Sequence, residues 1–372
     1  MKKIIYIANI RLPTEKAHGI QVMKTCEAFA EAGVDVELVF PRRYNHIKDN
    51  PFAYYGVRKI FSITWVPCLD LVHFGRIGFF VQSLTFSLVV LLRYYGLKKR
   101  MDTVFYSRDE VPSYVLSLFG IKVVWEAHMG HYNFFIRSLI RHDVPLVLIS
   151  GGLSDLYRSY GAKSTLIAPD GVDLKQFQIT ESRDEARLKL GLPAGVKLIV
   201  YTGHLYSWKG ADVLAEASPK LSNGVYSVFV GGTEKDIAVF KNKYGHIKNI
   251  MILGRKPHHE IPLYLRAADV LVIPNSAKEK ISRLYTSPMK LFEYMASGTP
   301  IVASKIPSIC EVLNERNSVL VQPDSPSDLA RGVNMALIET RETSEMAGRA
   351  LEDVKQFSWI KRAEGIINFV SL

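Results

Sequence analysis

The sequence lacks the short motifs that identify several large enzyme classes. It has no GxxxxGK[ST] segment, so a P-loop is excluded, and no GxGxxG follows its first apolar run, which leaves a nicotinamide-type dinucleotide site unsupported. HExxH and DxD are absent as well. The three cysteines, Cys26, Cys68 and Cys310, lie too far apart for a CxxC pair. They indicate a reducing compartment without a disulfide framework.

Long apolar runs are also absent. The most apolar segment, residues 77–92, has 16 residues and contains Gln82 and three hydroxyl side chains, whereas a spanning helix needs about 20 apolar residues. We expect a helix that lies in the core or at a membrane interface, with the core favoured, and no integral span. The apolar stretch near the N-terminus has seven residues, which is short for a signal peptide and suits a buried first strand.

Acidic residues are outnumbered by basic ones. The chain of 372 residues has 47 Lys and Arg against 36 Asp and Glu, a net charge of +11, with 48% apolar residues. This is a globular composition that suits anionic partners. Aromatic residues do not interleave with a basic stripe, so no nucleic-acid partner is expected. The basic residues 42–43 and 98–100 leave peripheral contact with an anionic membrane open, and so does the aromatic, basic helix predicted at 131–142, which could equally pack on the core.

Short runs rich in Val, Ile and Tyr alternate with helical patterns along the whole chain. The runs fall at 3–9, 34–40, 61–67, 103–109, 122–128, 145–150 and 164–169, and then at 198–203, 226–232, 249–254, 270–275, 300–304 and 318–323. A polar, charged segment at 173–195 separates the two series. Continuous apolar strands alternating with helices predict an α/β protein with two Rossmann-like, doubly wound parallel-sheet domains that face a cleft. Ligands of such sheets bind in the loops after the strands.

Two of these loops place a lysine at the start of a helix. Lys209 follows the strand at 198–203, and Gly210 next to it permits a close backbone approach. In SPMKLFEYMASG, Ser287 is the expected N-cap and Pro288 the first helical residue, so Lys290 lies in the first turn, where the helix dipole disfavours a cation. A bound phosphate would explain a lysine at this position, and so would a solvent-exposed ion pair between Lys290 and Glu293.

Two lysines at helix starts of the same predicted sheet favour the phosphate interpretation. Glu293 is then either a surface carboxylate or an acceptor for ribose hydroxyls. His128 and His131 have the spacing of a metal pair, but no third ligand is visible in the sequence, and no metal is expected.

With these residues in view, the chain resembles the GT-B-fold retaining glycosyltransferases of the family 4 type (glycosyltransferase group 1). SPMKLFEYMASGTPIVAS resembles the donor-binding signature of that family, and YTGHLYSWKGADVLAEA its diphosphate loop. IAPDGVDLKQF resembles the entry to the C-terminal domain, and FSWIKRAEGI the helix that crosses back. The resemblance implies an N-terminal acceptor-binding domain (1–172), a C-terminal domain that binds a nucleotide-sugar donor (173–355) and a crossing helix (356–372).

The resemblance also implies roles for individual residues. Lys209 would hold the donor diphosphate and Glu293 the ribose, while Lys290 would add positive charge. His128 would lie near the transferred sugar. The remaining implied donor-binding residues are His18 and Gly19 in a loop of the first domain, Gly203 and His204 in the diphosphate loop, Arg255 and Lys256 beside the base, and Tyr285, Ser287, Pro288 and Met289 in the signature turn.

Two positions depart from the family pattern. Tyr285 stands where the family usually has a glutamate that contacts the donor sugar, and His204 stands where it usually has an arginine. The sequence therefore also allows a catalytically silent protein that binds a nucleotide sugar, or a nucleotide-sugar epimerase on the same fold.

The expected reaction is metal-independent transfer of a hexose-type sugar, with retention, to a saccharide or lipid-linked acceptor. Such a reaction would serve the synthesis of a cell-surface polysaccharide or glycolipid. Lys209, Lys290 and His128 are the expected catalytic residues, the two lysines stabilising the departing diphosphate. A UDP-sugar is favoured over a GDP-sugar, no cofactor is expected, and the expected location is cytoplasmic, including the inner face of the membrane.

Overall fold

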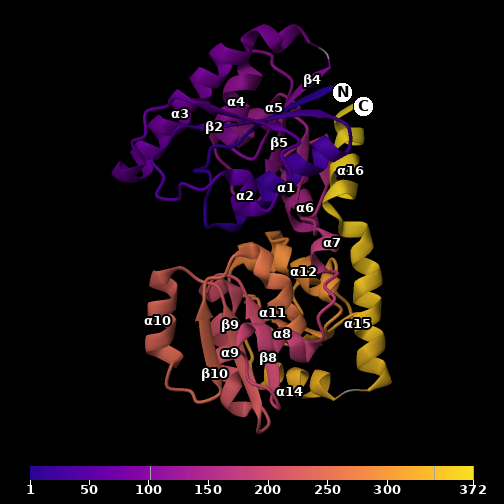
Figure 1. Ribbon diagram of the computed structural model, residues 1–372. Helices are drawn as coiled ribbons and strands as arrows, with labels where there is room; N and C mark the ends of the chain where they lie inside the picture. Colours follow the sequence, from indigo (N-terminus) through magenta and orange to yellow (C-terminus); the bar gives the residue numbers. More distant parts are fainter. Residues whose placement is uncertain (101, 339, 372) are drawn as a thin grey trace. The chain divides into compact units, whose positions relative to one another are not determined.

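The computed structural model describes residues 1–100, 102–338 and 340–371, and the chain divides into two compact units (Figure 1). Unit 1 consists of Met1–Pro169 together with Trp359–Leu372, and unit 2 consists of Asp170–Ser358. Each unit has a parallel sheet with helices on its faces. The prediction of an α/β protein with two doubly wound parallel sheets is confirmed.

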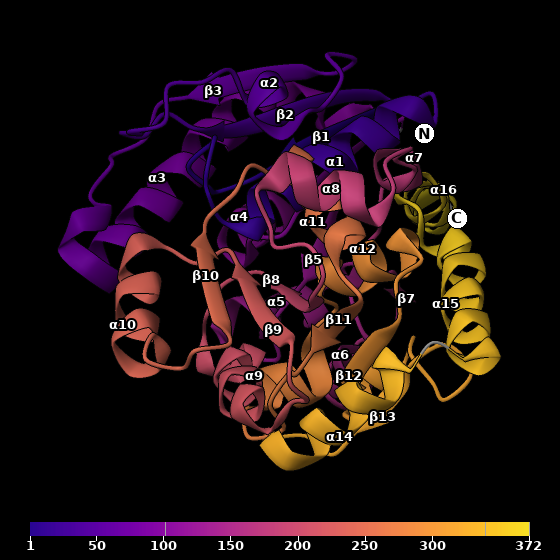
Figure 2. The same ribbon diagram turned by 60° about the horizontal axis from the view of Figure 1, so that its bottom comes forward.

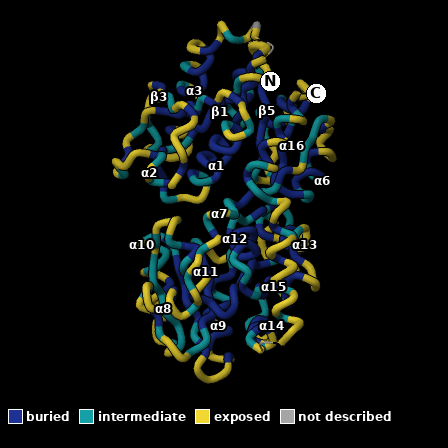
Figure 3. Tube along the Cα trace, turned by 45° about the vertical axis from the view of Figure 1, so that its right-hand side comes forward, coloured by how far each residue is buried: buried dark blue, intermediate teal, exposed yellow. Residues whose placement is uncertain are grey.

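Unit 1 has a seven-stranded sheet in the order β3-β2-β1-β4-β5-β6-β7, with every neighbouring pair parallel. The strands are β1 (Lys3–Ile7), β2 (Asp35–Pro41), β3 (Ser62–Val66), β4 (Thr103–Ser107), β5 (Val123–Ala127), β6 (Leu146–Leu148) and β7 (Thr165–Ile167). Central strands such as β1 and β5 are buried (Figure 3). The strand order reverses between β1 and β4, the point at which doubly wound sheets bind ligands.

The helices of unit 1 connect these strands. They are α1 (Ala17–Glu31), α2 (Pro51–Tyr55), α3 (Gly75–Tyr94), α4 (Glu110–Leu118), α5 (Phe134–Arg141), α6 (Gly151–Ser159) and, from the end of the chain, α16 (Trp359–Ser371), with short 3-10 segments η1 (Val72–Phe74) and η2 (Tyr95–Lys99). Although it is far away in the sequence, α16 packs against α1.

The start of α1 corrects one prediction. His18 and Gly19 were expected in a loop, but α1 begins at Ala17, so both lie in its first turn. The preceding Lys16 makes no side-chain cap, which explains why the sequence showed no helix start there. Gly19 is needed for packing, since a Cβ at this position would lie 2.1 Å from the hydroxyl oxygen of Tyr55.

The apolar segment 77–92 forms most of α3, and the preference for a core helix is wrong. The region Val72–Lys98 has the length and composition of a membrane span. Only 39% of its most apolar window is buried, which is too little for a core helix. Large apolar side chains on one face of α3 point to solvent, and Ile77 and Leu92 are each 79% exposed.

Unit 2 has a six-stranded parallel sheet in the order β10-β9-β8-β11-β12-β13 (Figure 2). Its strands are β8 (Lys197–Thr202), β9 (Val225–Val230), β10 (Ile250–Gly254), β11 (Val270–Ile273), β12 (Ile301–Ser304) and β13 (Val319–Val321). All thirteen predicted strands of the two units are thus confirmed. The order of this sheet reverses between β8 and β11.

The helices of unit 2 cover both faces of its sheet. They are α7 (Leu174–Phe177), α8 (Arg183–Leu190), α9 (Ala211–Ala217), α10 (Glu234–Tyr244), α11 (Ile261–Ala267), α12 (Met289–Ser297), α13 (Pro307–Cys310), α14 (Pro326–Leu337) and α15 (Arg341–Asp353), with the shorter segments η3 (Ser207–Lys209), η4 (Ser218–Lys220), η5 (His258–Glu260), η6 (Ile281–Tyr285) and η7 (Val354–Phe357).

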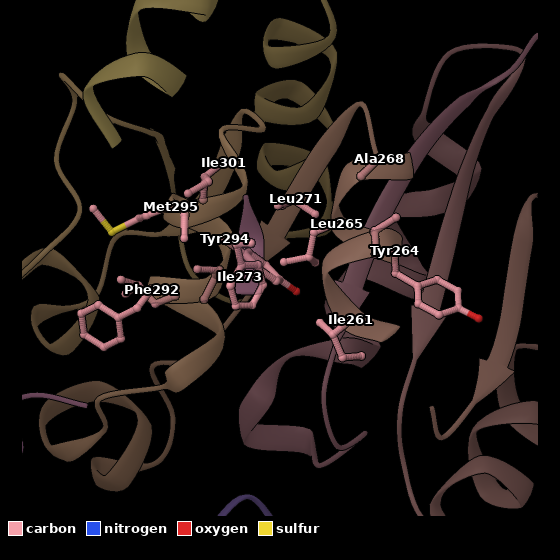
Figure 4. Close-up of a cluster of buried hydrophobic side chains, with 14 of the residues drawn as sticks. Ile261, Tyr264, Leu265, Ala268, Leu271, Ile273, Phe292, Tyr294, Met295 and Ile301 are labelled. Carbon is pink, nitrogen blue, oxygen red and sulfur yellow. The ribbon is translucent and has the colours of Figure 1, made fainter. Parts of the chain in front are cut away.

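The core of unit 2 has two apolar layers, one on each face of the sheet. Along β8, Leu198 and Val200 join one layer while Ile199 and Tyr201 join the other, as the period of two in a strand requires. Figure 4 shows the first layer, in which side chains of α11 and α12 pack against β11. Burial on both faces explains why the strands are continuously apolar.

The start of α12 differs by one residue from the prediction. Pro288 is the N-cap rather than the first helical residue, and Ser287 is not the cap. The Ser287 hydroxyl instead accepts a hydrogen bond of 3.1 Å from the backbone N–H of Asp170. Gly298 ends the helix in the left-handed conformation, as predicted.

Candidate functional site

The two lysines singled out in the sequence lie at the reversal point of the sheet in unit 2. Lys209 ends η3, which follows β8, and Lys290 is in the first turn of α12, which follows β11 and η6. Gly210 allows the two loops to touch, because a Cβ on it would lie 1.7 Å from the carbonyl oxygen of Pro274. Its φ of 74° also favours glycine. The fold therefore brings both lysines to one edge of the sheet.

Lys290 is a buried cation, with only 9% of the residue exposed. Its Nζ lies 3.9 Å from the centroid of the Tyr201 ring, and none of the described residues forms a hydrogen bond with it. Burial, followed by the charge of Lys209, lowers the pKa of Lys290 well below its usual value, against a smaller opposing effect of Glu293. An anion at this position would supply the missing partner.

Lys209 lies between aromatic side chains. Its Nζ is 5.2 Å from the ring centroid of Trp208 and 5.8 Å from that of Tyr206. Burial lowers the pKa of Lys209 to about 8. His204 stacks on Tyr206 with ring centroids 4.9 Å apart, and its Nδ1 lies 3.6 Å from a carboxylate oxygen of Asp236. This loop therefore presents one cation and a histidine beside it.

Glu293 is not a surface carboxylate, because only 8% of the residue is exposed. Its Oε1 lies 2.8 Å from Nε2 of His258, which belongs to η5. The predicted alternative of a solvated Lys290–Glu293 pair is therefore wrong. His258 was missed in the sequence, although the segment KPHHE directly follows β10 and so lies at the same edge of the sheet.

The other predicted donor-binding residues of unit 2 lie in or next to the loops that follow its strands. Gly203 directly follows β8 and has a φ of 124°. Gly231 approaches its carbonyl oxygen closely, because a Cβ on Gly231 would lie 2.3 Å from that oxygen. Arg255 is exposed and Lys256 half-buried, directly after β10. Tyr285 is buried at the end of η6, two residues before the Ser287 turn, and Pro288 and Met289 are half-buried.

In unit 1, the reversal point between β1 and β4 carries a carboxyl group that the sequence analysis missed. Asp109 accepts a hydrogen bond of 2.7 Å from the backbone N–H of Asn9, which follows β1. Burial nevertheless raises the pKa of Asp109 to about 6. A carboxyl with such a pKa at a strand end is a candidate for binding hydroxyl groups.

His128 follows β5 and contacts a buried polar network. Its Nε2 lies 2.5 Å from Oε1 of Glu126, which also accepts hydrogen bonds from Gln21 at 2.7 Å and from Arg362 at 2.8 Å. Burial alone would raise the pKa of Glu126, but the charges of Arg362 and His128 hold it well below the usual range. An ionised carboxylate can only accept, so Nε2 of a neutral His128 carries the proton.

Both histidines of the predicted unit 1 site are neutral near pH 7. Burial, and then the charge of Arg108, lowers the pKa of His128 to about 4. Burial and Arg108 likewise lower the pKa of His18 to about 3, and His128 contributes to that shift. His18, His128 and Arg108 therefore belong to one electrostatic cluster.

Among the described residues, no group of three or more His, Cys, Asp or Glu side chains has the arrangement of a metal site. His131, the second member of the HMGH pair, lies 3.4 Å from Glu110, which raises the pKa of that histidine.

Comparisons with known proteins concern the sequence of unit 2 and the fold. Residues 182–353 match the family model described as "Glycosyl transferases group 1", which covers most of unit 2. The putative teichuronic acid biosynthesis glycosyltransferase TuaC of Bacillus subtilis is 29% identical over 258 residues, which cover 68% of this chain and 62% of TuaC. A D-inositol 3-phosphate glycosyltransferase of Xylanimonas cellulosilytica is 28% identical over 228 residues, covering 58% and 53% of the two chains.

The fold is that of the GT-B glycosyltransferases. Anabaena Alr3699/HepE in complex with UDP superimposes with a TM-score of 0.76 at 15% identity, covering 99% of both chains. At that identity the likeness concerns the fold. The chain matches between about half and 62% of the length of the curated relatives.

Proposed function

We propose that this chain is a retaining glycosyltransferase of the family 4 type, which transfers a hexose-type sugar from a nucleotide diphosphate sugar. The acceptor is a hydroxyl of a saccharide or of a lipid-linked glycan in cell-surface polysaccharide or glycolipid synthesis. Unit 2 binds the donor and unit 1 the acceptor. The match of unit 2 to a glycosyltransferase family model supports the proposal, as do solved structures of the same fold that contain UDP and UDP-glucose.

One observation carries the donor site: the ammonium group of Lys290 is buried without a hydrogen-bond partner in the described structure, and the charge of Lys209 reaches it. Two adjacent cations in a partly dry site destabilise each other, and a diphosphate would neutralise both. Both lysines lie at strand ends where nucleotides bind in doubly wound sheets. The carboxylate of Glu293 would accept hydrogen bonds from ribose hydroxyls, while His258 holds it in place.

The chemistry follows from charge. Breaking the bond between sugar and phosphate leaves negative charge on the departing nucleotide diphosphate. Lys209 and Lys290 stabilise this leaving group, and the backbone N–H groups at the start of α12 add to the effect. Because these groups are preorganised, the reaction needs no metal ion. In the proposal, retention results from attack of the acceptor on the face from which the diphosphate leaves.

In unit 1, His128 is assigned to the transferred sugar, and His18 is assigned to the donor. A neutral His128 that donates to Glu126 through Nε2 leaves Nδ1 free to accept a hydrogen bond from a sugar hydroxyl. The carboxyl of Asp109 is available to bind an acceptor hydroxyl.

The test is calorimetric titration of the purified chain with UDP, GDP and a panel of their sugars, with and without EDTA. We expect one nucleotide series, UDP, to bind at micromolar strength regardless of EDTA. Lys209→Ala and Lys290→Met should each weaken this binding by about tenfold or more. Lys243→Met is the matched control, because Lys243 also lies over an aromatic ring, that of Tyr244, but is exposed on α10.

Product analysis tests the transfer itself. Retention predicts that the anomeric configuration of the donor sugar persists in the product, which NMR can determine. Binding of UDP-sugars without any transfer would assign the chain to the silent binding proteins, for which Tyr285 in place of the usual glutamate is the specific reason. Failure of every nucleotide to bind a folded protein would remove the donor site.

A further inference from the structure

Helix α3 turns its apolar face outward. The side chains of Ile77, Phe80, Leu84, Leu88 and Leu92 are spaced three or four residues apart, so they form one stripe along the helix, and all five are exposed. A helix of 20 residues is about 30 Å long, so the stripe runs along most of it. Figures 1 and 2 show α3 at the periphery of unit 1. Soluble proteins rarely expose a continuous apolar surface of this extent.

The inward face of α3 explains why the helix has this rotation. Gln82 donates a hydrogen bond of 2.8 Å to the side-chain oxygen of Asn9, and the side-chain nitrogen of Asn9 donates one of 2.7 Å to Ser83. Ser87 is also buried and donates to the carbonyl oxygen of Ser83. The bonds of Gln82 and Ser83 to Asn9 attach α3 to the loop after β1, and rotating the helix would leave these groups without partners. The apolar stripe is therefore held outward.

The exposed surface continues onto α5. The ring of Phe80 lies 6.1 Å from that of Phe135, and the neighbouring Phe134 is 66% exposed. Tyr132 and Met129, which precede α5, are exposed as well. The stripe of α3 and these residues of the α5 region together are called the apolar surface below.

Positive charges lie along the apolar surface on both α3 and α5. Arg76 and Arg93 lie at the two ends of the stripe, and both are exposed. Beyond them follow the exposed Lys98 and Arg100, while the side chain of Lys99 lies outside the described structure; Arg137 and Arg141 are exposed on α5. The sequence has no Asp or Glu in residues 71–101 or 127–142. Glu110 of α4 contacts His131 and Asn133 beside α5, so the border is mainly cationic. An apolar face with such a border complements a bilayer that carries anionic lipids.

Two other occupants fit less well. In a symmetric pairing of two copies through the middle of α3, Arg76 of each copy would approach Arg93 of the other, with no acid nearby to compensate. A membrane-spanning α3 would have to give up the hydrogen bonds that link Gln82 and Ser83 to Asn9 within unit 1. A helix that lies in the plane of the interface keeps these bonds and buries only its apolar face.

We propose that the apolar surface of α3 and α5, with its arginine border, is a docking surface for anionic lipid bilayers. On binding, Phe80, Leu84 and Leu88 enter the boundary between headgroups and acyl chains, while Arg76 and Arg93 contact lipid phosphates. This inference rests on unit 1 alone and does not depend on donor binding in unit 2.

The test is co-sedimentation of the full chain with vesicles of phosphatidylcholine, with and without one quarter phosphatidylglycerol. We expect binding to the anionic vesicles, weakened by salt, and little binding to the neutral ones. The double variant Leu84→Gln/Leu88→Gln should lower the partition coefficient by about tenfold or more, because two large side chains no longer enter the lipid. Arg76→Gln/Arg93→Gln should reduce the preference for anionic lipid.

Leu188→Gln is the matched control, since Leu188 is 82% exposed on α8 of unit 2, and it should bind like the wild type. All substituted positions are exposed, so thermal melts and UDP binding should be unchanged. Absence of wild-type binding to anionic vesicles, or equal binding of the Leu84/Leu88 variant, would overturn the proposal. So would a dimer in light scattering that this variant converts to a monomer, which would assign the surface to a second copy of the chain.

Discussion

The ammonium nitrogen of Lys290 lies 3.9 Å from the centre of the Tyr201 ring, so a cation of α12 rests against an aromatic ring of β8. Such a contact contributes about 0.5–2 kcal/mol. The effective penalty for burying an ion is several kcal/mol. The ring therefore offsets only part of the penalty, and without an anion Lys290 destabilises unit 2.

Replacing this lysine should separate stability from binding. Lys290→Met should raise the free energy of unfolding by about 1–3 kcal/mol at pH 7, because an unsatisfied buried group is removed. The same change should weaken UDP binding by about tenfold to a hundredfold, the worth of a hydrogen bond to a charged group. Urea denaturation and calorimetry measure the two effects. Lys243→Met should change neither, and a Lys290→Met variant that is less stable than the wild type would contradict the argument.

Donor binding should weaken at alkaline pH. Burial places the pKa of Lys209 at about 8, so the free protein loses this positive charge as the pH rises through 8, and the diphosphate loses a partner. UDP binding at pH 8.5 should then be accompanied by proton uptake, detectable by calorimetry in buffers of different ionisation enthalpy. In Lys209→Arg the guanidinium stays charged, so the proton uptake should fall to the part contributed by Lys290, whose pKa is also lowered by burial. An affinity that does not change between pH 7 and 9.5 would rule out this role.

Unit 1 should lose stability in acid. The pKa values of His18 and His128 are lowered to about 3 and about 4, below the usual value near 6.5. The unfolded chain therefore binds more protons between pH 6.5 and 4, and the free energy of unfolding falls as the pH falls through this range. Each histidine contributes up to about 1.4 kcal/mol per pH unit.

The acid effect can be assigned with single variants. His18→Gln and His128→Gln should each reduce the slope of stability against pH between 6.5 and 4. The raised pKa of Asp109, about 6, has the opposite sign, because the folded protein then binds the extra proton and loses stability as the pH rises from 4 to 6. Asp109→Asn should therefore steepen the fall of stability in acid. Unchanged slopes in all three variants would show that other groups control the acid transition.

Removing one partner of the buried ion pair between Glu126 and Arg362 should lower the stability of unit 1. Both side chains are almost fully buried, so Arg362→Met leaves an unpaired carboxylate and should destabilise unit 1 by about 3–5 kcal/mol. Glu126→Gln should also lower the pKa of His128 further, because Glu126 is one of the groups that raise it. Denaturation of the variants and an NMR titration of His128 measure these effects. A His128 pKa that rises in Glu126→Gln would contradict them.

The strands could be predicted because their signal is local. Segments such as Lys197–Thr202 are apolar at every position, since parallel strands are buried on both faces, and Gly298 marks a helix end by its own conformational freedom. The positions of Lys209 and Lys290 after β8 and β11 also follow from the order of the segments. The edge of the sheet that carries the candidate site was thus accessible from the sequence.

Partners that are distant in the chain were not accessible. His258 lies 35 residues before Glu293, and nothing in either segment specifies that they meet. The rotation of α3 likewise depends on Asn9, which lies 73 residues before Gln82, so the composition of residues 77–92 could not show which face is buried. Hydrogen bonds between residues distant in the chain determine both the His258–Glu293 contact and the rotation of α3.

The position of Arg362 has a consequence for synthesis on the ribosome. This side chain completes the buried network of unit 1, where it donates to Glu126 and to the backbone oxygens of Ala168 and Pro169. It is translated only after all of Asp170–Ser358. Unit 2 is contiguous in the chain and can finish folding first, whereas the nascent unit 1 keeps Glu126 without its countercharge until α16 has left the exit tunnel.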